Sequence, residues 1–188
     1  MSGDGFPNVV WIPANEKRYL KMTSRRIDAI VLHCTDGSAV DAKQTARNVF
    51  ASPPEVGPDG KLRAQSAHYI VGRDGTVVQC VRHKDMAYHV NAENPTTIGV
   101  EHNARSPQDT TLTDIQYWRS AQLVIWLGKT LGIPSTDRWY LWGHSEIDPG
   151  TTHSSCPQRA LDWDTYMKAL ADVQAVERGE TPMRLWDQ

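Results

Sequence analysis

The chain has little of several features that mark whole classes of protein. Its three cysteines are an odd number that cannot pair completely, so the sequence does not indicate a disulfide scaffold. Its 20 basic and 22 acidic residues give a net charge of −2, without the basic excess of nucleic-acid-binding proteins. Its longest apolar run, residues 123–127, is too short to cross a bilayer. We therefore expect no nucleic-acid partner and no integral membrane association.

The termini also lack recognisable signals. Residues 1–25 contain no apolar core of a secretory signal, which predicts that the chain is made in the cytoplasm and does not take the Sec route. A length of 188 residues suits one domain with a full core. We expect a polar arm over 1–26, the domain over 27–176 and a loose tail over 177–188. The sequence does not determine the oligomeric state, and a monomer is the favoured one.

The order of apolar runs predicts an α/β fold, a single domain with a mixed central β-sheet flanked by helices. Strands are expected at 28–35, 67–71, 76–81, 97–101 and 139–142, helices at 41–51, 113–131 and 162–176, and a loop over 52–61. The turn residues 73–76 predict that the second and third strands form a hairpin. Thr113 and Gln116 have the spacing of a capping box at the start of the longest helix.

Three residues far apart in the sequence could together bind a metal. His33 and His144 each stand where an apolar strand ends, and Cys156 lies in a polar segment where packing does not require a cysteine. Cys34 and Cys80 lie in apolar runs, and we expect both to be buried core residues. Two imidazoles and a thiolate are a suitable set for zinc with an open fourth position. The spacing alone is a weak signal, and rim histidines that only form hydrogen bonds are an equal alternative.

Glu101 is a further candidate because it ends the strand-like run 97–100. An ion pair or a solvated strand end is the simpler explanation of a carboxylate there. Beside a zinc-bound water, the same carboxylate could act as a general base.

Five segments in this order resemble the type 2 N-acetylmuramoyl-L-alanine amidases, a zinc enzyme family that also contains peptidoglycan recognition proteins. The segments are Ile-Val-Leu-His-Cys-Thr (30–35), Ser-Ala-His-Tyr-Ile-Val-Gly-Arg-Asp-Gly (66–75), Ala-Tyr-His (87–89), Thr-Ile-Gly-Val-Glu (97–101) and Gly-His-Ser-Glu-Ile-Asp-Pro-Gly (143–150) running on to Cys-Pro (156–157). The resemblance covers about residues 27 to 167. It implies hydrolysis of the amide between N-acetylmuramic acid and L-alanine of the stem peptide, with peptidoglycan or a muropeptide as the substrate.

The resemblance also implies roles for individual residues. It places one zinc ion per chain on His33, His144 and Cys156, with Glu101 as the catalytic base. Ala67 stands where another branch of the family has a catalytic tyrosine, which favours Glu101. Either Ser154 or His153 is expected to stabilise the oxyanion, and His89, Tyr88 and Asn94 are expected to bind substrate. Of the remaining histidines, His68 is expected to be structural, and His83 and His102 are expected at the surface.

Several readings remain open at this stage. His144 and Glu146 form the H-x-E of zinc nucleobase deaminases, but the paired cysteines that those enzymes need are missing. A cysteine hydrolase using Cys34 or Cys156 and a non-catalytic muropeptide-binding module are the other classes. Within the amidases we expect a lytic enzyme of endolysin type that acts on the bacterial cell wall. A cytoplasmic enzyme that recycles anhydro-muropeptides and an exported antibacterial effector are the alternatives.

Overall fold

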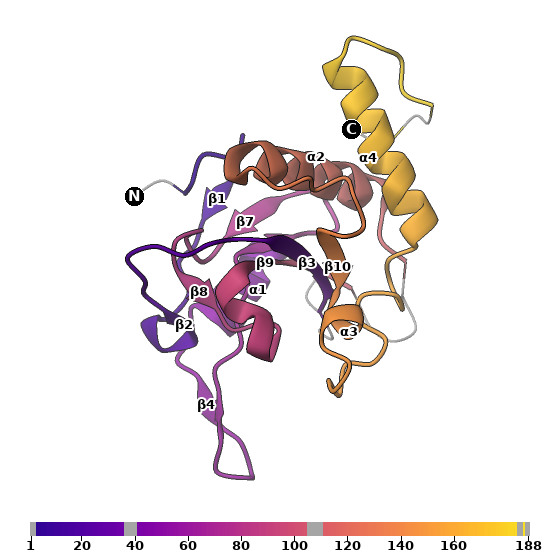
Figure 1. Ribbon diagram of the computed structural model, residues 1–188. Coiled ribbons are helices and arrows are strands. Elements are labelled where there is room, and N and C mark those ends of the chain that lie inside the picture. Colours follow the sequence, from indigo (N-terminus) through magenta and orange to yellow (C-terminus); the bar gives the residue numbers. More distant parts are fainter. Residues whose placement is uncertain (1–2, 36–40, 105–110, 184–185, 187–188) are drawn as a thin grey trace.

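A six-stranded mixed sheet forms the centre of the computed structural model, which describes residues 3–35, 41–104, 111–183 and 186 (Figure 1). Its order is β1-β7-β6-β9-β3-β10, and all neighbours are parallel except β6 and β7. The strands are β1 Val10–Trp11, β3 Ala29–Cys34, β6 Tyr69–Val71, β7 Val77–Gln79, β9 Thr97–His102 and β10 Leu141–Gly143. This confirms the predicted mixed sheet and the predicted β6–β7 hairpin.

The helices and two small ribbons complete the fold. The helices are α1 Ala42–Thr45, α2 Asp114–Leu131, α3 His144–Ile147 and α4 Trp163–Glu177. Helix α1 continues as a π-helical turn over Ala46–Phe50, and short 3-10 turns lie at Glu16–Arg18 and Asn91–Thr96. The antiparallel ribbons are β2 Tyr19–Leu20 with β8 Met86–Ala87, and β4 Glu55–Val56 with β5 Leu62–Arg63. Among the described residues, every helix is too short or too polar to cross a membrane.

The sheet buries both of its faces. Successive strand residues point to opposite sides, so Tyr69 and Val71 enter one core, with α2 and α4, while Ile70 enters a second core with α1. Figure 1 shows α2 lying across the sheet with α4 beside it. The predicted capping box is present, because Thr113 Oγ1 accepts from Gln116 N and Gln116 Oε1 accepts from Thr113 N.

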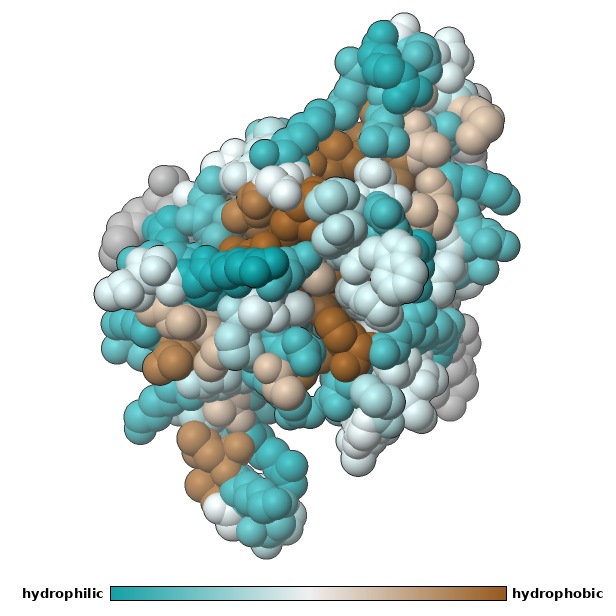
Figure 2. All heavy atoms as spheres, in the orientation of Figure 1, coloured by the Kyte–Doolittle hydropathy of each residue, from teal (hydrophilic) through white to brown (hydrophobic). Residues whose placement is uncertain are grey.

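Two predicted segments differ from the structure. The strand expected at 139–142 begins only at Leu141, because Asp137 Oδ1 accepts from Trp139 N in a turn that leaves Trp139 76% exposed. The loop expected at 52–61 instead contributes β4 to a hairpin that protrudes from the molecule (Figure 1). Apolar side chains gather on this hairpin in Figure 2, where Val56 and Leu62 are 67% and 53% exposed.

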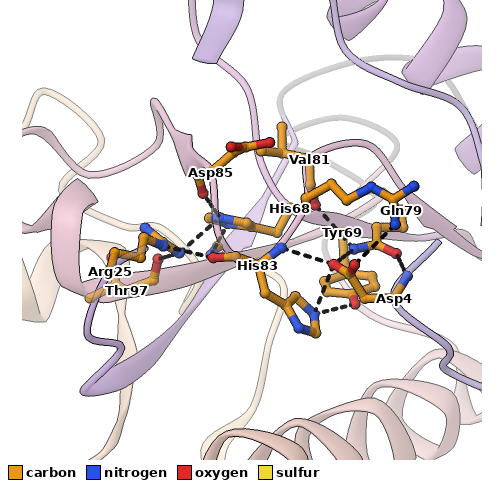
Figure 3. A network of polar contacts seen from close by, with 11 residues as sticks. Asp4, Arg25, His68, Tyr69, Gln79, Val81, His83, Asp85 and Thr97 are labelled. Carbon is orange, nitrogen blue, oxygen red and sulfur yellow. Dashed lines mark hydrogen bonds and ion pairs between the residues drawn. The ribbon is translucent and has the colours of Figure 1, made fainter. Parts of the chain in front are cut away.

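The N-terminal segment is tied to the main sheet. It supplies the edge strand β1, and Asp4 accepts hydrogen bonds from Gln79 Nε2 and His83 N (Figure 3). Arg25 donates to the carbonyl oxygens of Asn94 and Thr97, both at 2.8 Å. Residues that precede the first long strand therefore brace the loop that leads into β9.

Three sequence-based expectations are wrong. His102 is fully buried rather than at the surface, because its ring bridges His33 O and Ser120 Oγ. His83 is also largely buried, with 12% of its side chain exposed, and its Nε2 lies 2.6 Å from Tyr69 Oη (Figure 3). The tail is not loose at Trp186, which is 4% exposed and stacks on Trp118. Cys34 and Cys80 are buried, as predicted.

Candidate metal centre

Parallel pairing brings three strand ends to one edge of the sheet. In the β3–β9 register His33 lies opposite Glu101, and in the β3–β10 register Leu32 lies opposite Gly143. His144 follows Gly143 directly as the first residue of α3, so it arrives next to His33. The register thus places His33, near the end of β3, beside His144, directly after β10, with Glu101 on β9, which pairs with the other edge of β3.

Cys156 reaches the same point from the irregular segment after α3. Ser145 N donates to Cys156 O, and Cys34 N donates to Cys156 Sγ at 3.3 Å. Gly143 allows this approach, because a Cβ there would lie 2.7 Å from Pro157 Cδ. The candidate ligand atoms of His33, His144 and Cys156 all lie within 4.8 Å of one another, and the two Nδ1 atoms are 3.2 Å apart.

These residues fit a zinc ion. Two nitrogens bound at about 2.0–2.1 Å to a tetrahedral centre are separated by roughly 3.3 Å, close to the distance between His33 Nδ1 and His144 Nδ1. Imidazole nitrogen and thiolate sulfur are the donors that zinc prefers. Three protein ligands leave one tetrahedral position for a water or a substrate atom, as in catalytic zinc sites.

The electrostatic surroundings favour neutral imidazoles. Burial, followed by the nearby His89 and His144 rings, holds the pKa of His33 well below its usual value. Burial, followed by the neighbouring His153 ring, also lowers the pKa of His144. The side chain of Cys34, burial and the charge of Glu101 raise the pKa of the Cys156 thiol. A bound cation would reverse this last effect and stabilise the thiolate.

One residue beside the ligands was missed by the sequence analysis. Asp148 Oδ2 lies 3.7 Å from His144 Nε2 and accepts a 2.6 Å hydrogen bond from Asn91 Nδ2. At 3.7 Å the carboxylate is beyond hydrogen-bond distance of His144 Nε2, which has no hydrogen-bond partner among the described residues, and it acts on the ring through its charge. Asp148 lies four residues after His144, and this spacing could have identified it.

The three candidate ligands face a cavity of about 920 Å³. Its wall includes the other predicted site residues Glu101, Tyr88, His89, Asn94 and His153. Ser154 is exposed and is absent from the described residues that line the cavity, whereas His153 lines it and stacks on the His144 ring with a centroid separation of 5.5 Å. The cavity extends from the metal centre to Leu62 and Arg63 of the β4–β5 hairpin.

Two residues predicted to bind substrate also have structural partners. Asn94 Oδ1 accepts hydrogen bonds from both His89 N and Val90 N, at 2.8 and 2.7 Å. The ring nitrogens of His89 contact His33 and Thr97. Tyr88 also lines the cavity, and its backbone N donates to Ser66 Oγ.

Comparison with known proteins concerns the sequence and the fold of the chain. The chain is 26% identical over 135 residues to N-acetylmuramoyl-L-alanine amidase A of Achromobacter lyticus, which covers 71% of this chain and 69% of the relative. Its fold is similar to that of an AmpD derivative (TM-score 0.68, 21% identity, 90% and 99% of the two chains covered). It is also similar to a mutant endolysin from Bacillus subtilis (TM-score 0.66, 17% identity, 88% and 99% covered). The profile of the type 2 N-acetylmuramoyl-L-alanine amidases matches residues 23–159, most of the chain, which therefore belongs to this enzyme family.

Proposed function

We propose that the chain is a zinc-dependent peptidoglycan amidase of lytic, endolysin type. It would cleave the amide that joins the lactyl group of N-acetylmuramic acid to L-alanine. The observation that carries the zinc requirement is the convergence of His33, His144 and Cys156, whose candidate ligand atoms lie within 4.8 Å at the cavity wall. A zinc ion held by these residues would supply a Lewis acid, able to polarise a carbonyl and to lower the pKa of a bound water.

Glu101 is the proposed general base. It lies opposite His33 in the β3–β9 register and lines the cavity. Its carboxylate takes one proton from the attacking water and delivers it to the nitrogen of the leaving L-alanine amine. The water oxygen first adds to the carbonyl carbon, which leaves negative charge on the carbonyl oxygen, and the C–N bond then breaks as the carbonyl re-forms. The products are a free amine and the lactyl carboxylic acid, which gives up the second water proton to the solvent.

His153 is the better placed of the two proposed oxyanion residues, because it lines the cavity whereas Ser154 does not belong to the described lining. A ring N–H donor there would stabilise negative charge on the carbonyl oxygen. Tyr88 and Asn94 also line the cavity and are proposed to contact the sugar or stem peptide.

The extent of the cavity is the observation behind our preference for a polymeric substrate. The cavity reaches Leu62 and Arg63 of the exposed β4–β5 hairpin. It therefore offers contacts to more of the substrate than the lactyl group and the L-alanine at the scissile bond. We therefore favour intact cell wall as the substrate and the cell wall as the site of action.

The test measures zinc content and cleavage of two substrates, intact sacculi and a soluble anhydro-muropeptide. We expect about one zinc per chain, loss of activity with a chelator, recovery with zinc, and faster release of amines from sacculi. Glu101→Gln should lower kcat by about 10²–10⁴-fold while zinc stays bound, and Glu180→Gln, remote from the cavity, is the matched control.

Activity that survives metal removal would indicate a thiol mechanism. Preference for the soluble substrate would assign a recycling enzyme, and binding without turnover would assign a recognition module.

A further inference from the structure

The His89 ring lies in the cavity wall, but both of its nitrogens face other protein groups. Nδ1 lies 3.0 Å from His33 Nε2, and Nε2 lies 3.2 Å from Thr97 Oγ1. The ring also packs edge-on against the rings of His33 and His68, with centroid separations of 5.1 and 5.8 Å. These contacts are those of a residue that supports its neighbours.

The direction of each hydrogen bond follows from Thr97. Its hydroxyl has a single proton, which it donates to Glu93 O at 2.7 Å. Thr97 Oγ1 can then only accept from His89, so His89 Nε2 carries the ring proton. In a neutral imidazole the other nitrogen has a lone pair, and His89 Nδ1 therefore accepts from His33 Nε2–H.

The same reasoning reaches the metal centre. A proton on His33 Nε2 leaves the lone pair on His33 Nδ1, the atom that lies 3.2 Å from His144 Nδ1. Metal-ligating histidines bind through the nitrogen that lacks a proton. A chain of hydrogen bonds from Glu93 O through Thr97 and His89 thus selects the His33 tautomer that can ligate zinc.

The surroundings hold the His89 ring in this position. Asn94 Oδ1 accepts from the backbone nitrogens of His89 and Val90, which sets the direction of the loop. Gly99 makes room for the ring, because a Cβ there would lie only 2.6 Å from His89 Cγ. The ring position therefore depends on groups from β9 as well as on its own loop.

We propose that His89 is a positioning residue that holds the His33 ring in its ligating tautomer and orientation, in place of the direct substrate contact expected from the sequence. The inference rests on the proposed zinc dependence. It predicts that the hydrogen-bond acceptor on residue 89, rather than a histidine as such, is what the metal site requires.

The test measures zinc affinity by competition with a chromophoric chelator. His89→Ala should weaken zinc binding by about 10–100-fold, the usual effect of removing a residue that supports a metal ligand. His89→Asn, whose amide oxygen can accept from His33 Nε2–H, should recover most of that loss. Tyr88→Phe alters the adjacent cavity wall and should leave zinc affinity unchanged.

A second readout follows the tautomer without any activity measurement. ¹⁵N NMR of the metal-free protein should show His33 protonated at Nε2 in the wild type and a mixture of tautomers in His89→Ala. Should His89→Ala fail to fold, Thr97→Val removes the acceptor for His89 Nε2–H, while Thr97→Ser keeps it. We then expect weaker zinc binding in Thr97→Val and wild-type binding in Thr97→Ser.

The outcomes separate this inference from the proposed function. A wild-type protein that binds no zinc would overturn the proposed function. Tight binding by the wild type, with an unchanged zinc affinity and His33 tautomer in His89→Ala, would overturn the role of His89 alone. A raised KM in that variant would then assign His89 to substrate binding.

Discussion

Replacing Gly99 by alanine tests the close packing of the His89 ring against β9. The new Cβ would lie 2.6, 2.7 and 2.9 Å from His89 Cγ, Nδ1 and Cδ2. Carbon atoms rest about 3.5–4.0 Å apart, so the ring would have to move by about 1 Å. The strand has little room to yield, because Gly99 O accepts from His68 N and Gly99 N donates to His68 Nδ1, both at 3.0 Å.

We expect Gly99→Ala to lower the free energy of unfolding of the metal-free protein by about 2 kcal/mol. Overpacking a filled site costs about 1–3 kcal/mol, and the displaced ring gives up part of its hydrogen bonding to His33. Zinc affinity should fall as well, because the ring that supports His33 has moved. Urea-induced unfolding without metal measures the first effect, and chelator competition measures the second.

Gly150→Ala is the matched control, because among the described residues its Cβ would come within 4 Å of Asp148 Oδ1 alone, at 3.9 Å. Its free energy of unfolding should stay within about 0.5 kcal/mol of the wild type. A Gly99→Ala protein with wild-type stability and wild-type zinc affinity would refute the reasoning, since the ring could not then occupy the space beside β9.

Three further predictions concern the fold. Thr113→Ala removes the N-cap acceptor of α2 and should cost about 1 kcal/mol in urea unfolding, whereas Thr113→Ser should restore it; equal loss in both would contradict the capping role. Trp186→Ala should cost about 3 kcal/mol, because the indole is buried and donates to Asp172 Oδ2; a change below 1 kcal/mol would show that the tail does not pack there. Burial, which outweighs the opposing charge of Asp4, lowers the pKa of His83 below 6.5, so the unfolded chain takes up the proton first as the pH falls. The wild type should therefore lose stability from pH 7.5 to 5.5 more steeply than His83→Gln, and parallel pH profiles would rule this out.

Local patterns predicted the elements that bury a continuous apolar surface. The strand that ends at His33 and the helix that begins after Thr113 appear where the sequence predicts them, because their periodicity and capping are local properties. The sequence predicts the strand before His144 two residues too early, because a hydrogen bond from Trp139 N to Asp137 Oδ1 sets the turn that precedes it. Such a hydrogen bond leaves no periodic signal.

The burial of isolated polar residues was not predictable in the same way. His83 and His102 have no apolar pattern around them that distinguishes a buried ring from an exposed one. Their burial depends on partners more than ten residues away, namely Tyr69 for the former and Ser120 for the latter. Trp186 likewise has its partner on α2, far from the tail in sequence.

By itself, the sequence determined the α/β class, the two strand-end histidines and, through five ordered segments, the resemblance to the amidases. Only the tertiary structure decided that Cys156 meets both histidines, that Glu101 lies opposite His33, and that His89 uses its ring nitrogens on His33 and Thr97. The physical reason is that elements arise from contacts between near neighbours. A metal centre instead depends on strand register and loop closure, which join residues up to 123 positions apart, as for His33 and Cys156.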